Sequence, residues 1–165
     1  MKRLLIFLMA MGLIASSIVP ALAANFDTQV VQFQILAIDE LEASGNPGML
    51  TIDTATAGSS ALTPAIDAST TYALTTNGTN RKITGQITTG GDMPANTTLE
   101  VQLVAPTGGS GGVYQFLTSA SAADLVTGIT QLAENSKTIT YRFSATLAAG
   151  TLSDSRTVTL TLTGP

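Results

Sequence analysis

Few residues of this chain could do chemistry, and one group of them forms a recognisable motif. Gly108 to Gly112 spell Gly-Gly-Ser-Gly-Gly, which matches the G-x-S-x-G pattern around the nucleophilic serine of many hydrolases. Such a serine needs a strand before it, a helix after it and a histidine to act as its base. Here Pro106 precedes the motif, an alternating run follows it, and the chain contains no histidine. We therefore interpret the motif as a flexible loop.

The acidic residues Asp39, Glu40 and Glu42 form a second group, and their oxygen atoms are of the kind that calcium prefers. On a strand, Glu40 and Glu42 would share one face and Asp39 would lie on the other, and the spacing is not that of an EF-hand loop. A solvated edge or turn is the favoured interpretation. The chain also lacks cysteine, so ligands for zinc, haem or iron–sulfur clusters are missing. We nominate no catalytic, cofactor-binding or metal-binding residue and expect that the protein is not an enzyme.

The first residues carry the pattern of a secretory leader. Lys2 and Arg3 precede an uncharged apolar run from Leu4 to Ile14, and Ala21 and Ala23 are the small residues of an A-x-A cleavage site. The run is short for a membrane span. The pattern therefore predicts a helical signal peptide that is cleaved after Ala23.

This processing defines the expected organisation: a signal peptide over residues 1–23 and a single domain over residues 24–165. Seven basic residues less the two of the leader leave five against eleven acidic ones, a net charge of −6. Nucleic acid is therefore an improbable partner, and no stable membrane span is expected after cleavage. We expect a disulfide-free secreted protein of the periplasm, the cell surface or the extracellular matrix.

Alternation of apolar and polar residues runs through most of this domain and predicts strands with one buried and one wet face. The Asn77-Gly78 pair predicts a hairpin turn, residues 54–69 a loop, and residues 122–126 a single helical turn. The expected fold is an all-β, two-sheet antiparallel Greek-key sandwich, immunoglobulin-like, of about eight strands, with a closed barrel as the alternative. The candidate strands are 26–38, 40–43, 49–53, 70–75, 81–88, 98–105, 113–117, 137–147 and 156–163.

Three alternating sets of apolar residues are expected to meet in one core. They are Leu99, Val101 and Leu103; Ile139, Tyr141 and Phe143; and Val158, Leu160 and Leu162.

The strand predicted over residues 26–38 has two interpretations. It could complete the sandwich of its own chain, or residues 24–38 could be exchanged so that the strand completes the sheet of a neighbour. In either case the alternate residues that would face inward are Val31, Phe33, Ile35 and Ala37.

Two sequons, at Asn77 and Asn96, match the pattern for N-glycosylation and lie in predicted turns. The pattern leaves open whether either asparagine is modified.

The layout of the chain resembles that of cysteine-free bacterial surface and pilus subunits, in particular the major fimbrial subunits of the CS1 type. The resemblance rests on the alternating segment Gln29 to Ile38 after the leader, the stretch Thr75 to Ile83, and the alternating C-terminal strand Thr157 to Thr163. It implies a structural subunit of a surface filament, fimbria or extracellular matrix that associates with itself or with other surface proteins, with strand donation as its route of assembly. The alternative is a secreted, monomeric adhesion module for glycan or protein.

Overall fold

The computed structural model describes residues 27–165. The signal peptide, its cleavage site at Ala21 and Ala23, and residues 24–26 lie outside the described residues. The chain divides into two units between Gln34 and Ile35, and every described strand belongs to the second unit.

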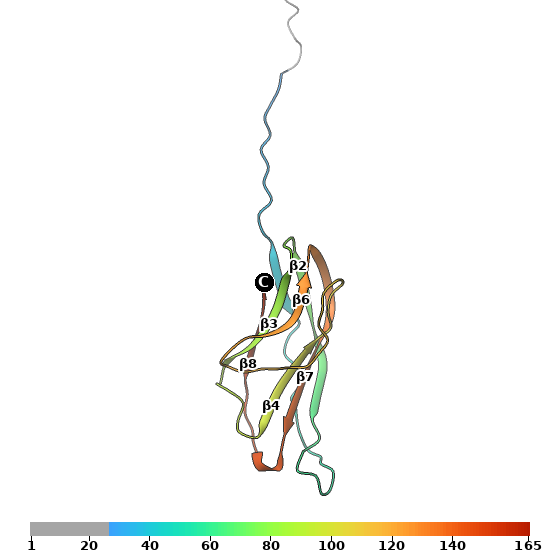
Figure 1. Cartoon of the computed structure of the whole chain (residues 1–165), viewed down its shortest axis with the longest axis vertical. Helices are drawn as coiled ribbons and strands as arrows, with labels where there is room; N and C mark the ends of the chain where they lie inside the picture. The colour runs from blue at the N-terminus through green and yellow to red at the C-terminus, as the bar shows by residue number, and fades with distance from the viewer. Residues whose placement is uncertain (1–26) are drawn as a thin grey trace, which may run out of the picture. The chain divides into compact units, whose positions relative to one another are not determined.

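Residues 27–165 form eight strands and one 3-10 turn, and no α-helix (Figure 1). None of these residues forms a helix of the length and apolar character that would span a bilayer. In chain order the elements are β1 (Asp39–Ala43), β2 (Ala65–Thr76), β3 (Arg81–Thr89), β4 (Thr97–Leu103), β5 (Gln115–Phe116), β6 (Ala123–Ile129), β7 (Leu132–Ala145), η1 (Leu147–Ala149) and β8 (Thr157–Thr163).

The strands make two antiparallel sheets, one of five strands in the order β1-β2-β7-β4-β5 and one of three in the order β6-β3-β8. Buried residues from both sheets form one apolar cluster, so the sheets pack face to face. The prediction of an all-β chain with two antiparallel sheets is confirmed, and the arrangement is that of a β-sandwich.

The core forms as the alternation predicts. On β4 and β7, Val101 lies opposite Tyr141 in the ladder, and Leu103 lies opposite Ile139. These side chains are buried, while Val158, Leu160 and Leu162 of β8 are half-buried against the same cluster. Alternate residues of paired strands point to one face, so each apolar set reaches the space between the sheets.

The hairpin predicted at Asn77-Gly78 is wrong. β2 pairs with β1 and β7, whereas β3 pairs with β6 and β8. The turn therefore carries the chain from one sheet to the other. Asparagine followed by glycine favours a tight turn, but it does not decide whether the flanking strands bond to each other or to other strands.

Four further predictions are wrong. Residues 122–126 belong largely to β6 instead of a helical turn, because Leu125, Val126 and Ile129 enter the core from a strand. Residues 49–53 form no strand, and β2 begins at Ala65, inside the predicted loop. Residues 27–38, the described part of the longest predicted strand, form no strand at all.

Candidate functional site

The segment from Asp27 to Ile38, here called the arm, is exposed along its whole described length. Phe33 is 92% exposed and Ile35 is 83% exposed. The predicted inward residues Val31, Phe33, Ile35 and Ala37 are therefore all exposed. Val30, Leu36 and Ile38 are exposed as well.

The composition of the arm makes this exposure costly. No charged residue lies between Asp27 and Asp39, and no glycine or proline interrupts the run. Valine, isoleucine and phenylalanine are strong strand formers, and burial of each such side chain is worth about 1.5–3 kcal/mol. A contiguous exposed apolar segment of this kind marks an interaction site.

The C-terminal end of the arm is held by Asn77, the residue that follows the last pair of the ladder between β1 and β2, Asp39 opposite Thr76. Its side-chain Oδ1 accepts a hydrogen bond from the amide of Ile38 at 2.9 Å, and its Nδ2 donates to the carbonyl of Leu36 at 2.7 Å. Its own backbone amide donates to the carbonyl of Ile38 at 3.2 Å. The side chain thus supplies to the arm the acceptor and the donor that the backbone of a further β2 residue would have supplied.

In the sequence, Asn77 stands out only as a turn residue and as the asparagine of a glycosylation sequon. The pattern of the sequence held no signal for this clamp, because the partner lies 39 residues away. N-glycosylation would attach a sugar to Nδ2, the atom that donates to the carbonyl of Leu36. At the other sequon, Asn96 has a positive φ of 65° and donates from Nδ2 to the carbonyl of Ala148 at 3.4 Å.

The acidic side chains of Asp39, Glu40 and Glu42 do not form one site. Asp39 forms an ion pair with Arg81 at 2.7 Å and accepts a hydrogen bond from the hydroxyl of Thr76 at 2.6 Å. Glu40 and Glu42 are exposed on β1. Within residues 27–165, no three acidic side chains gather in a way that would hold a metal ion.

Three of the four sheet edges carry features that prevent strand addition. β1 has five residues, of which three are acidic, and β5 has two residues. β6 pairs with β3 through shifts of register, and its outer side is bridged to Ser110 by two backbone hydrogen bonds of 2.9 Å.

The fourth edge, β8, is regular and open. It pairs with β3 without a shift from Thr163 opposite Lys82 to Val158 opposite Ile87, and it holds no charged residue and no proline. In the described part of the chain, its backbone hydrogen-bonds to no strand but β3. β1 approaches β8 from the other sheet without bonding to it. Val158, Leu160 and Leu162 are therefore left half-buried at the side of the core.

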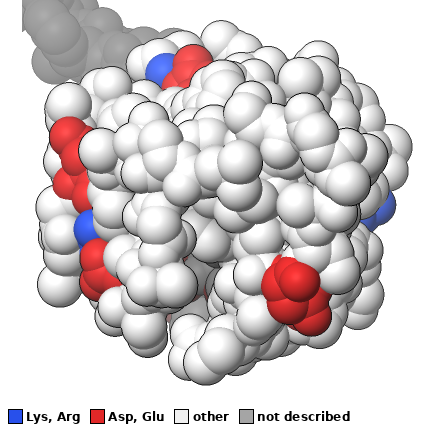
Figure 2. Space-filling view, turned by 90° about the horizontal axis from the view of Figure 1, so that it is seen from below, with Lys and Arg blue, Asp and Glu red and all other residues white. Residues whose placement is uncertain are grey.

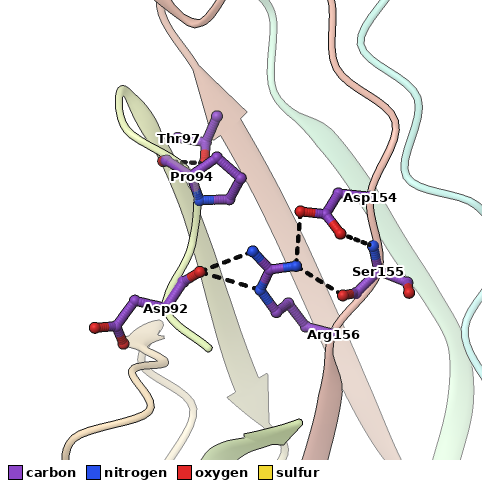
Figure 3. A network of polar contacts seen from close by, with 6 residues as sticks. All are labelled: Asp92, Pro94, Thr97, Asp154, Ser155 and Arg156. Carbon is purple, nitrogen blue, oxygen red and sulfur yellow. Dashed lines mark hydrogen bonds and ion pairs between the residues drawn. The ribbon is translucent and has the colours of Figure 1, made fainter. Parts of the chain in front are cut away.

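Arg156 fixes the loops at the beginning of β8 (Figure 3). Its Nε and Nη2 donate to the carbonyl of Asp92 at 3.1 and 2.8 Å, and its Nη1 donates to the carbonyl of Ser155 and pairs with Asp154, both at 2.8 Å. The hydrogen bond from Arg156 lowers the pKa of Asp154, and the amide of Ser119 lowers that of Asp92. A shallow depression of about 570 Å³ lies beside Arg156, whose donors are already satisfied by the protein.

The serine of the G-x-S-x-G motif, Ser110, has a structural role at the edge of β6. Ser110 exchanges two backbone hydrogen bonds with Thr127 and so closes the outer side of β6. The strand–turn–helix setting that a nucleophilic serine requires is not the setting of this loop.

Charge is sparse on the molecule. Figure 2 shows isolated charged atoms on a surface that is mostly uncharged. Each of the five basic residues in the described range pairs with a carboxylate at 3.1 Å or less. Of the aromatic residues of the strands, Tyr72 and Tyr141 are buried and Phe116 is 61% exposed.

Comparison of the chain with protein-family models, with curated proteins and with solved structures returns no match. The arm and the open edge of β8 are therefore the two features of this structure from which a function is inferred.

Proposed function

We propose that the protein is a secreted structural subunit of a surface filament, fimbria or extracellular matrix, and that it assembles when the arm of one molecule joins the sheet of another as a strand. The exposed apolar arm carries this proposal. An extended segment that adds to a sheet edge gains affinity from main-chain hydrogen bonds and specificity from alternate side chains. Val31, Phe33, Ile35 and Ala37 are the alternate side chains in this case.

The geometry of donation favours a filament. Each molecule would give its arm to one neighbour and receive an arm from another, and a head-to-tail contact that does not close a ring continues without limit. The five ion pairs within the described domain support the same role, because every basic side chain there already has a carboxylate partner, which leaves no unpaired positive charge to recruit a nucleic acid or an anionic surface.

The topology of the two sheets is part of the same proposal. The sheet orders place strands side by side that are far apart in the chain, such as β2 beside β7 and β3 beside β8. Such crossovers support a Greek-key, immunoglobulin-like sandwich. The leader pattern of residues 1–23 supports a cleaved signal helix before it. The layout that resembles CS1-type fimbrial subunits supports the structural role.

Assembly of the chain from Ala24 onward tests the proposal. We expect light scattering and electron microscopy to show polymers whose amount rises with concentration. Phe33→Asp should abolish them while the far-ultraviolet β-spectrum stays unchanged, because the arm contributes nothing to the core.

Gln34→Asp is the matched control, since it adds the same charge at the neighbouring position on the other face of the donated strand. It should assemble nearly as the parent does. A parent protein that stays monomeric at millimolar concentration would contradict the proposal and favour a monomeric adhesion module.

A further inference from the structure

We infer that the arm joins the free edge of β8 in a second copy of this chain, and that Asn77 keeps the arm from pairing with β8 of its own domain. This inference rests on the proposed function and adds the acceptor surface and the reason for donation between molecules.

The acceptor strand is inferred by comparing how well each of the four sheet edges could pair with an added strand. β1 would meet an incoming strand with Asp39, Glu40 and Glu42, and β5 offers two residues. Ser110 already bonds the outer side of β6. β8 alone among the described edges offers seven uncharged residues, six of them, from Val158 to Thr163, in regular register, and its outward side chains are threonines, which suit a strand.

The arm and this edge also match in chemistry. Residues 29–37 are uncharged, and at about 3.3 Å per residue they span the length of β8. A strand added beside β8 would place alternate apolar side chains next to Leu160 and Leu162, which are half-buried at the side of the core. Donation therefore covers apolar surface on both partners, which is the main source of affinity in such contacts.

Pairing within one molecule is opposed by the direction of the chain. β1 begins and β8 ends at the same end of the domain, because Asp39 pairs with Arg81 and Thr163 lies opposite Lys82; Figure 1 shows the C-terminus beside the start of β1. An arm lying on its own β8 would run parallel to it and then reverse direction at Ile38 to enter β1.

The hydrogen bonds of Asn77 oppose that reversal. Its two side-chain hydrogen bonds to Leu36 and Ile38 hold these residues extended and in line with β1. To fold back, the chain would have to break both bonds and leave the amide of Ile38 and the carbonyl of Leu36 without these partners. The arm of a second molecule meets no such constraint.

The acceptor is tested with the full-length Phe33→Asp variant, which cannot donate its own arm, and a synthetic peptide of residues 27–38. Hydrogen exchange followed by NMR should show protection of β8 amides by more than tenfold on addition of the peptide. The same peptide carrying the Phe33→Asp change should protect none.

The outcomes separate the two proposals. Protection at one of the other edges, β1, β5 or β6, instead of β8 would overturn this inference and leave strand donation standing. No protection at any strand, together with a parent protein that does not polymerise, would overturn both.

The clamp is tested with Asn77→Ala, and with Asn77→Ser if the first variant folds poorly. Asn46→Ala serves as control, because Asn46 is exposed and lies outside the strands. We expect the Asn77 variants to form several-fold less polymer and to show concentration-independent protection of β8 in the dilute monomer. Polymerisation at the parental level with unprotected β8 amides would overturn the role of Asn77.

Discussion

Arg142 on β7 holds Glu100 on β4 with two parallel hydrogen bonds, 2.6 Å from Nε to Oε2 and 2.7 Å from Nη2 to Oε1. The two residues lie directly opposite each other in the ladder, on the side of the sheet away from the core. Glu100 is only 6% exposed, and the guanidinium lies 4.0 Å from the centre of the Tyr114 ring. An ion pair at an outward position of the sheet is thereby shielded from water.

Loss of this pair should be measurable in urea unfolding. Arg142→Met leaves the carboxylate of Glu100 buried without its partner, and we expect it to cost about 2 kcal/mol of unfolding free energy. The double variant with Glu100→Gln should cost less than the sum of the single variants. Lys82→Met is the control, because its partner Asp124 is half exposed, and it should cost less than about 1 kcal/mol. Equal losses of unfolding free energy for Arg142→Met and Lys82→Met would contradict the conclusion that burial of Glu100 makes its ion pair the stronger one.

The core assignment is tested by a matched pair of leucines. Leu103 is fully buried at the end of β4, whereas Leu152 is 45% exposed in the loop before β8. Leu103→Ala should destabilise the domain by about 2–5 kcal/mol, because it removes buried apolar atoms and leaves a cavity. Leu152→Ala should change stability by less than about 1 kcal/mol. Similar melting temperatures for the two variants would refute the packing described above.

The dependence of stability on pH should be flat near neutrality and fall in acid. Hydrogen bonds from Lys137 and then Thr107 lower the pKa of Glu134 to about 2, and those of Asp92 and Asp154 are lowered as well. Depressed carboxyl pKa values stabilise the fold fully above about pH 4–5, and this contribution is lost as the pH falls through the folded values. Burial raises the pKa of Tyr141, so stability should also fall above about pH 10.

Thermal melts between pH 2 and pH 11 check this profile. The chain has no histidine, so the melting temperature should vary little from about pH 6 to pH 9. Glu134→Gln should lie below the parent at pH 7, and the difference should shrink as the pH approaches 2. A difference that grows in acid would contradict the sign of the effect.

Export should remove the leader after Ala23. The exported protein should have the mass of residues 24–165 and begin with Ala24, because the apolar run and the small residues at Ala21 and Ala23 suit signal peptidase. Ala23→Arg should block processing, and Leu22→Ile, at the unconstrained middle position, should not. Exported protein that keeps Met1 would refute the prediction.

The faces of the longest strands could be predicted because they depend on local alternation alone. Val101, Tyr141 and Leu160 stand in runs with a period of two, and all three contact one core. The strand β6 was missed because its apolar residues Leu125, Val126 and Ile129 do not alternate. It forms where β3 and the Ser110 loop supply partners on both sides.

Pairing between strands was beyond prediction for a related reason. The Asn77-Gly78 turn signals a reversal, but the partners of β2 and β3 are chosen by apolar faces that lie far away in the chain. Only the folded domain assigns β2 to one sheet and β3 to the other, and only there does Asn77 meet Leu36 and Ile38.

The arm shows most clearly what the amino-acid sequence determines and what the tertiary structure decides. The sequence by itself determined that residues 29–38 are uncharged, mostly apolar and suited to a strand. The tertiary structure decided that this segment forms no strand and that β8, within the described residues, keeps an open edge. The physical reason is that alternation specifies which face of a strand is apolar, whereas its partner depends on chain direction, free edges and distant hydrogen bonds such as those of Asn77.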